Sequence, residues 1–165
     1  MKSLAEQMSF YQQYHRSTKN KATHFIGVPA IVLGIMQALS WVPLGHTRFT
    51  LADALAIAVL IYYFRLDVPL AVAATILFGV LLTGAHTLSA NLSAVGAWTT
   101  FGALFVGGWI LQLIGHVFEG RKPALADNVF QVFIAPIFLI AEVAFALGYK
   151  PSLHEAILKN DTRHA

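Results

Sequence analysis

The longest stretches without a charged side chain constrain most strongly what this chain can fold into. No Asp, Glu, Lys or Arg occurs in residues 68–118, and a second such stretch covers residues 22–47. Charged residues make up 12% of the chain, whereas about one quarter is usual in a soluble domain. A soluble domain could hardly cover its surface with such segments. The sequence therefore predicts that these segments face lipid.

Five apolar segments approach or reach the length of about 20 residues that a spanning helix needs. They are residues 25–45, 51–64, 70–88, 97–118 and 129–147. Residues 1–21 are polar and lack the apolar core of a signal peptide, so they predict a short amphipathic helix before a retained first span. No repeat or linker divides the chain. We expect a single all-α domain over residues 1–165, an integral membrane bundle of about five transmembrane segments.

The distribution of positive charge predicts the orientation of this bundle. With five spans, one side carries Lys2, Arg16, Lys19, Lys21, Arg65, Arg121 and Lys122, and the other carries Arg48, Lys150, Lys159 and Arg163. Loops rich in Lys and Arg stay preferentially in the cytoplasm, so the N-terminus is expected there. The membrane would be a bacterial inner membrane or the endoplasmic reticulum. If residues 51–64 do not span fully, the C-terminal tail changes sides.

The composition excludes several kinds of site. The chain has no cysteine, so neither a disulfide nor a thiolate metal site can form. It has no glycine-rich phosphate loop, no Gly-x-Ser-x-Gly elbow and no His-Glu-x-x-His motif. The net charge of +3 clusters near the predicted membrane ends, which indicates membrane lipids and not nucleic acid as a partner. Any metal must be held by nitrogen and oxygen ligands.

Histidines gather near the predicted ends of the apolar segments. His116 and Glu119 stand three residues apart at the end of segment 97–118, so both can reach one metal ion from the same helix face. Helix bundles hold di-iron and di-manganese centres with a similar carboxylate and histidine spacing. Taken alone, the pair is explained equally well by polar side chains that reach the membrane interface.

His15 and His24 could join this site. They are nine residues apart and lie on opposite faces of a continuous helix, so a shared site requires a break between them. Residues 17–20 predict such a break, with Asn20 as the cap of the next helix. In the five-segment bundle both histidines lie at the same membrane face as the His-x-x-Glu pair. Three imidazoles and a carboxylate suit Fe(II), Mn(II) or Zn(II); the alternative is that His15 and His24 bind lipid headgroups.

Glu142 lies within segment 129–147, and an ionisable group in a membrane span is a functional candidate. It could orient a ligand imidazole through a hydrogen bond, or it could be a protonated packing residue. The remaining histidines are expected away from the site, at the opposite membrane face or in loops and the tail. They are His46, His86, His154 and His164.

The candidate ligand histidines belong to two longer motifs. The first consists of Tyr14-His15, Asn20, His24, Gly27 and Pro29. The second consists of Gly115-His116, Glu119 and Pro123-Ala124-Leu125. Together with a final helix that contains a glutamate, here Glu142, these motifs resemble the Mpo1-like family of 2-hydroxy fatty acid dioxygenases. The resemblance covers nearly the whole chain, although the second and third apolar segments match only in character.

The resemblance implies an Fe(II)-dependent enzyme that converts a long-chain 2-hydroxy fatty acid and O2 into CO2 and the fatty acid one carbon shorter. This conversion removes four electrons from the substrate, as many as the reduction of O2 to water takes up, so no other reductant is required. The metal ligands and catalytic residues implied are His15, His24, His116 and Glu119. Residues expected to support the ligands or the substrate are Tyr14, Asn20, Arg121 and Glu142.

Two other functions remain open from the sequence. One is a different metal-dependent membrane enzyme that acts on lipids, such as a hydroxylase or a hydrolase. The other is a non-enzymatic protein, either a metal or proton transporter or a lipid-binding bundle. A transporter should carry polar residues at mid-membrane on several helices, whereas the histidines here gather at predicted helix ends. This placement favours an enzyme at the membrane interface.

Overall fold

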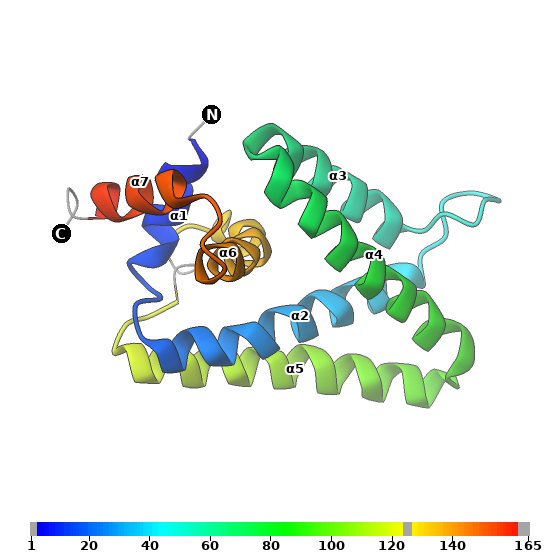
Figure 1. Ribbon diagram of the computed structural model, residues 1–165. Helices are drawn as coiled ribbons and strands as arrows, with labels where there is room; N and C mark the ends of the chain where they lie inside the picture. Colours follow the sequence, from blue (N-terminus) through cyan, green and yellow to red (C-terminus); the bar gives the residue numbers. More distant parts are fainter. Residues whose placement is uncertain (1–2, 124–126, 162–165) are drawn as a thin grey trace.

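The computed structural model describes residues 3–123 and 127–161, which are all-α and contain seven helices and no β-strand (Figure 1). The helices are α1 (Leu4–Gln12), α2 (Thr18–Ser40), α3 (Leu51–Leu66), α4 (Val68–Asn91), α5 (Ala94–Glu119), α6 (Gln131–Ala146) and α7 (Pro151–Asp161). The predicted all-α class is confirmed.

Helix α2 is the centre of the structure and contacts α3, α4, α5 and α6. It lies alongside α5 over most of its length, while the α3–α4 hairpin crosses its C-terminal end and α1, α6 and α7 gather near its N-terminal end (Figure 1). The predicted polar tail forms α7, which packs on α1 and buries Ile157. The last described residues therefore lie close to the N-terminal helix.

Local sequence signals explain where several helices begin and end. Ser3 and Glu6 form a capping box at the start of α1, and Thr50 and Asp53 form another at the start of α3. The Asp67 side chain accepts a hydrogen bond of 3.0 Å from the backbone N–H of Leu70 at the start of α4. These caps satisfy backbone N–H groups that no helical carbonyl can reach.

Glycines allow α2 and α5 to approach each other closely. They stand seven residues apart on both helices, as Gly27 and Gly34 on α2 and Gly108 and Gly115 on α5. A Cβ atom on Gly108 would lie 2.6 Å from Cγ1 of Ile31 and 2.9 Å from the carbonyl oxygen of Gly27. Small residues are what membrane helices use to bring their backbones together. We call this contact between α2 and α5 the glycine seam.

The structure corrects the number of transmembrane segments. Within the described residues, three helices are long and apolar enough to cross a membrane, namely α2, α4 and α5. A fourth span results only if α6 and α7, bent by 120°, are taken as one. The predicted segment 51–64 forms α3, which has 16 residues and a length of about 24 Å, against roughly 30 Å of hydrocarbon. The prediction of about five spans was therefore too high, and the orientation of the N-terminus stays a prediction.

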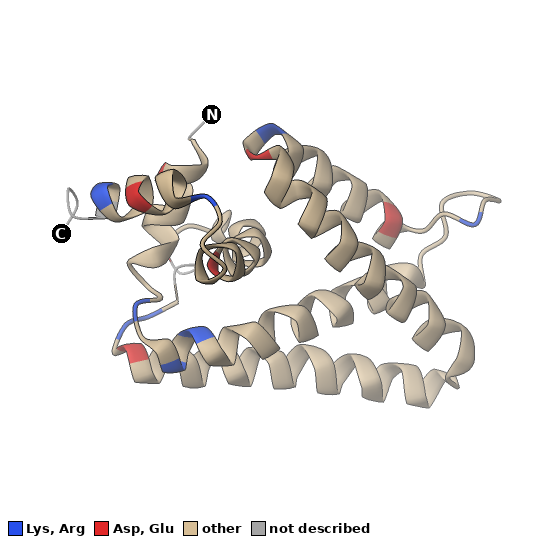
Figure 2. Ribbon diagram, in the orientation of Figure 1, with Lys and Arg blue, Asp and Glu red and all other residues tan. Residues whose placement is uncertain are grey.

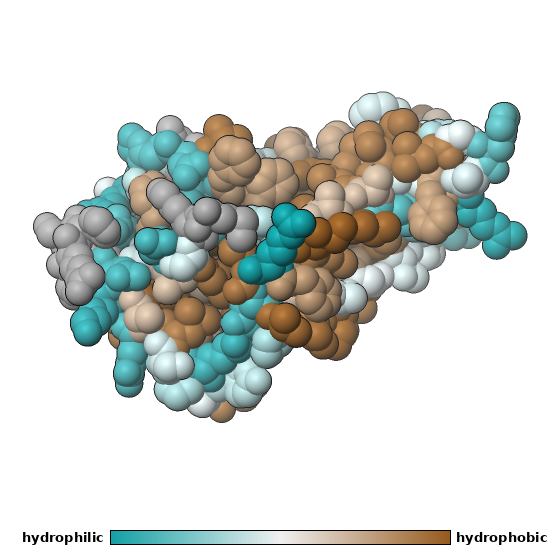
Figure 3. Space-filling view, turned by 90° about the horizontal axis from the view of Figure 1, so that it is seen from above, coloured by the Kyte–Doolittle hydropathy of each residue, from teal (hydrophilic) through white to brown (hydrophobic). Residues whose placement is uncertain are grey.

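The surface of the helices agrees with a protein embedded in lipid. Figure 2 shows that Lys, Arg, Asp and Glu residues gather at the helix ends, while the middle of α2, α4 and α5 carries none. Large apolar side chains point outward along α3 and α4, for example Ile61, Ile76 and Val80. Figure 3 shows apolar side chains over much of one face, with hydrophilic ones mostly toward its two ends. Such an apolar exterior indicates a membrane protein.

Candidate metal centre

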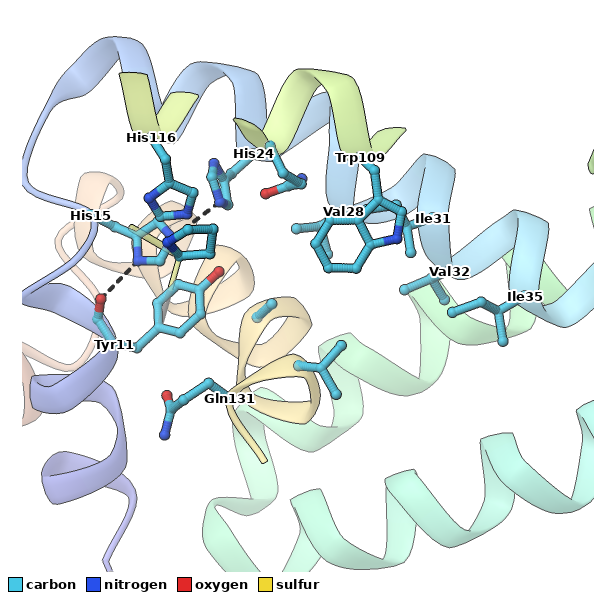
Figure 4. Close-up of a pocket in the computed structure, with 14 residues that line it drawn as sticks. Tyr11, His15, His24, Val28, Ile31, Val32, Ile35, Trp109, His116 and Gln131 are labelled. Carbon is cyan, nitrogen blue, oxygen red and sulfur yellow. Dashed lines mark hydrogen bonds between the residues drawn. The ribbon is translucent and has the colours of Figure 1, made fainter. Parts of the chain in front are cut away.

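Three histidines from separate parts of the chain meet at the N-terminal end of α2 (Figure 4). His15 lies in the turn between α1 and α2, His24 lies in α2, and His116 lies in the last turn of α5. Each offers a ring nitrogen, and the three nitrogens lie within 4.8 Å of one another. The three side chains are buried. Among the described residues, this is the one group of three or more His, Asp or Glu side chains placed to hold a metal ion.

A break between α1 and α2 makes this meeting possible. Helix α1 ends at Gln12 and α2 begins at Thr18, so the predicted break is confirmed and lies a few residues earlier than expected. The prediction that Asn20 caps α2 was wrong, because Ser17 occupies the cap position. Asn20 lies in the first turn and is fully buried, and its side-chain Nδ2 donates to the Tyr14 carbonyl at 2.9 Å. It therefore braces the turn that carries His15.

The hydrogen bonds of His15 and His24 fix the tautomer of both rings, that is, which ring nitrogen carries the proton. Nδ1 of His15 lies 2.7 Å from the Tyr11 carbonyl oxygen, and Nδ1 of His24 lies 2.9 Å from the Asn20 carbonyl oxygen. A carbonyl can only accept, so both Nδ1 atoms carry the proton. In the neutral imidazoles both Nε2 atoms then present a lone pair. These Nε2 atoms face each other at 3.0 Å.

Two lone pairs that face each other in a buried site repel unless a cation lies between them. Protonation of a ring would supply a cation, but burial and, to a smaller extent, the neighbouring His24 ring lower the pKa of His15 to about 3. His15 is therefore neutral near pH 7, which is the state in which an imidazole binds a metal. The arrangement fits a divalent metal ion held by nitrogen ligands.

The third imidazole completes the cluster. The ring centroid of His116 lies 5.0 Å from that of His15 and 5.2 Å from that of His24, and both contacts are edge to face. Nδ1 of His116 is buried and has no hydrogen-bond partner among the described residues. A buried ring nitrogen without a partner costs free energy, and coordination of a metal would remove that cost. The donor set of three imidazoles is thus available.

Glu119 holds the turn before α2 against the end of α5. Its Oε1 accepts from the backbone N–H of Arg16 at 2.9 Å, and its Oε2 accepts from the N–H of Ser17 at 2.8 Å. The Asn20 side chain donates to the same Oε2 at 3.0 Å. The carboxylate thus compensates the free N–H groups and the positive dipole end at the start of α2. It is not a member of the three-histidine group.

The other residues predicted to support the site contact the protein away from the imidazoles. The Tyr14 hydroxyl donates to Asp127 at 2.6 Å, and the Arg121 guanidinium donates to the Gln13 carbonyl at 3.1 Å. Glu142 forms an ion pair of 2.8 Å with Lys21. The main-chain carbonyls described above, and not Glu142, orient the two imidazoles. His86 contacts Asp53 at 3.2 Å, at the other end of the α3–α4 hairpin from the turn at Asp67.

An apolar cavity of about 90 Å³ opens beside the three imidazoles (Figure 4). One wall follows α2 through Val28, Ile31, Val32 and Ile35. Trp109 of α5 and Ala135 of α6 also line the cavity. Seven residues of helix correspond to a length of about 10 Å. The cavity therefore extends from the histidines along about two turns of α2, with room for the first few methylene groups of an alkyl chain.

Tyr11 is a residue of this site that the sequence analysis missed. Its ring stacks on that of His15, with 3.9 Å between the ring centroids and an interplanar angle of 4°. Tyr11 also lines the cavity. Tyr11 precedes His15 by four residues, and side chains at this spacing are neighbours on a helix face. An aromatic residue one turn before a candidate ligand was the signal that could have identified it.

The fold and the site define a class: a helical membrane protein with a buried three-histidine centre beside an apolar cavity. The chain belongs to the Mpo1-like family, because the family model described as 2-hydroxy-palmitic acid dioxygenase Mpo1-like matches residues 1–147. It is 37% identical over 165 residues to the 2-hydroxy-palmitic acid dioxygenase MPO1 of Saccharomyces cerevisiae. The matched region covers 96% of this chain and 88% of the yeast protein. No solved structure matches the chain significantly.

Proposed function

We propose that this protein is a dioxygenase that shortens long-chain 2-hydroxy fatty acids by one carbon with Fe(II) bound by His15, His24 and His116. One observation carries this proposal. The Nε2 atoms of His15 and His24 are buried, face each other at 3.0 Å with their lone pairs, and lie beside an apolar cavity. The balanced reaction is RCH(OH)COOH + O2 → RCOOH + CO2 + H2O. The substrate supplies all the electrons, and the C1–C2 bond is the one that breaks.

Iron bound in this centre would supply the activation of O2 and a Lewis acid for the oxygen atoms of the substrate. The chain itself supplies neutral imidazoles whose orientation is fixed by the Tyr11 and Asn20 carbonyls. The walls of the cavity exclude water and bind the alkyl chain along α2. The likeness to the yeast enzyme supports 2-hydroxy-palmitic acid as the first substrate to test.

The cytoplasmic location of the site belongs to the same proposal. Lys19 and Lys21 stand in the first turn of α2, close to the three histidines. Positively charged residues that flank a span favour the cytoplasmic side. A substrate dissolved in the same membrane can reach the cavity by lateral diffusion, which explains why such an enzyme is built from membrane helices.

Oxygen uptake by the detergent-purified protein, loaded anaerobically with Fe(II), tests the proposed function. Adding 2-hydroxy-palmitic acid should consume one O2 per molecule of substrate and yield CO2 and the acid one carbon shorter. Palmitic acid, which lacks the 2-hydroxyl, should give no uptake. A folded protein that binds iron but consumes no O2 with 2-hydroxy acids of any chain length would contradict the proposal. A hydroxylated or hydrolysed product would indicate a different metal-dependent lipid enzyme.

The sequence predicts Glu119 as a metal ligand, whereas in the structure both of its carboxylate oxygens accept hydrogen bonds from the start of α2. Glu119→Gln distinguishes these two roles. The amide has one acceptor oxygen where the carboxylate has two, so it cannot satisfy the N–H groups of Arg16 and Ser17 and the Asn20 side chain together. We expect a loss of about 1.5–3 kcal/mol in the free energy of unfolding, the range for hydrogen bonds to a charged group. The iron content should stay unchanged, because three imidazoles remain.

Thermal unfolding measures the stability of the Glu119→Gln protein, and metal analysis measures its iron content separately. The exposed Glu155 of α7 provides the matched control, since Glu155→Gln should change neither. If Glu119→Gln loses its iron and keeps its stability in the metal-free state, Glu119 is a metal ligand.

A further inference from the structure

Buried polar atoms of the cavity wall lack a hydrogen-bond partner among the described residues, namely Nε2 of Gln112, Oε1 of Gln131 and Nδ1 of His116. The Gln112 side chain lines the cavity, is 6% exposed, and its Nε2 is buried and unpartnered. The Tyr11 side chain is 4% exposed, and its hydroxyl points into the space between the imidazoles and Trp109 (Figure 4). None of the described residues forms a hydrogen bond with that hydroxyl. Buried polar groups in proteins are almost always satisfied, so the Gln112 amide calls for a ligand, and the Tyr11 hydroxyl faces the same space.

Both groups are held rigidly beside a ligand histidine. Gln112 precedes His116 by four residues on α5 and so lies one helical turn from that imidazole. Tyr11 lies in α1, and its ring stacks on that of His15 in the turn that follows. The Gln112 amide rests against Gly27, where a side chain would collide with it. The Tyr11 ring is fixed by stacking on His15 and by contact with Phe138 at 4.7 Å. Neither group can easily turn away to find another partner.

We propose that the Tyr11 hydroxyl and the Gln112 amide form a carboxylate-binding subsite that orients the acid head group of the substrate at the three-histidine centre. This inference rests on the proposed function. A phenol and an amide both donate hydrogen bonds, and a carboxylate only accepts them. A tyrosine hydroxyl is protonated at neutral pH and is therefore available as a donor. No described Lys or Arg lines the cavity, so recognition of the acid falls to neutral donors. Oε1 of Gln131, which also lines the cavity, only accepts hydrogen bonds and cannot bind a carboxylate.

The subsite explains how an apolar cavity can select a particular lipid. With the carboxylate at Tyr11 and Gln112, the alkyl chain extends along Val28, Val32 and Ile35. The carboxyl group and the carbon next to it, which bears the 2-hydroxyl, then lie at the end of the cavity where the imidazoles are. A few placed polar groups in an apolar pocket commonly fix ligand orientation in this way. A lipid without a free carboxylate would enter the same cavity, but its reacting carbon would not be held at a fixed position relative to the imidazoles.

Anaerobic binding of 2-hydroxy-palmitic acid to the iron-loaded full-length protein tests the subsite without turnover. We expect Tyr11→Phe and Gln112→Leu each to weaken binding about tenfold or more, the loss usual for a hydrogen bond to a charged group. Binding of the methyl ester of the same acid should be unchanged, because the ester has no carboxylate. The melting temperature should stay the same or rise, since neither side chain loses a protein partner.

Two buried residues outside the cavity provide matched controls. The Tyr63 hydroxyl donates to the Phe133 carbonyl at 2.5 Å, and the Gln37 side chain donates to the Ala97 carbonyl at 3.2 Å. Tyr63→Phe and Gln37→Leu should therefore lower the melting temperature and leave acid binding unchanged. The subsite is overturned if Tyr11→Phe and Gln112→Leu bind the acid as the wild type does, or if they weaken acid and ester binding equally. Wild-type binding without O2 uptake would reject the proposed function and leave the subsite in place.

Discussion

Replacement of His24 by alanine is expected to abolish iron binding and to reduce O2 uptake more than 100-fold. His24 presents its Nε2 atom to that of His15 at 3.0 Å, so the substitution leaves only two imidazoles in the cluster. Even residues that only orient metal ligands contribute about 10–100-fold to affinity or activity. Loss of a ligand itself should exceed that range. Metal analysis after anaerobic loading, together with initial rates of O2 uptake, measures the effect.

The stability of the protein gives a second readout of the same substitution. A ligand that binds only the folded state at 100 times its Kd adds about 2.7 kcal/mol to the free energy of unfolding. Fe(II) should therefore raise the melting temperature of the wild type and should not raise that of His24→Ala. His86→Ala is the control, because His86 contacts Asp53 and lies outside the three-histidine group. A His24→Ala protein with a full complement of iron would show that the cluster is not the metal site.

The apolar segments of the sequence predicted where helices lie better than how many of them cross the membrane. The charge-free stretch 68–118 covers nearly all of α4 and α5, and both are candidate spans. Segments 51–64 and 129–147 are as apolar, but α3 and α6 have only 16 residues each. Hydropathy measures how readily a residue enters lipid. It carries no information on where a helix begins and ends, which for α3 is set by the caps at Thr50 and Asp67.

The candidate site was predictable to the extent that it depends on local sequence. A break between His15 and His24 is encoded by the polar residues between them, and it brings the two imidazoles together as expected. The partners of Glu119 were not predictable, because its hydrogen bonds to Arg16 and Ser17 join residues about one hundred positions apart. Only the packing of α2 on α5 creates them. The spacing of His116 and Glu119 indicates a shared helix face and does not say which partners that face meets.

That packing leads to the second large effect, since Gly115→Ala is expected to damage the fold and the site together. A Cβ atom on Gly115 would collide with the Thr23 hydroxyl and the Asn20 side chain, and it would lie 3.2 Å from Nδ1 of His24. Overpacking of this kind costs about 1–3 kcal/mol. The helices can relieve it only by moving apart, and a displacement of about 1 Å at a reacting centre can cost about 100-fold in rate. We therefore expect lower thermal stability, weaker iron binding and a rate reduced by about that factor.

Gly107→Ala is the matched control, because it makes the same change on the same helix where no atom lies within 4 Å of the added Cβ. It should bind iron and consume O2 as the wild type does, with equal or slightly higher stability, since alanine favours a helix more than glycine does. If both variants retain iron and activity, the close approach of α2 and α5 is not needed for the site. If only Gly115→Ala fails, the glycine seam sets the position of His116 relative to His24. The helix contact that lets the protein pack in a membrane is then also what holds the metal ligands in place.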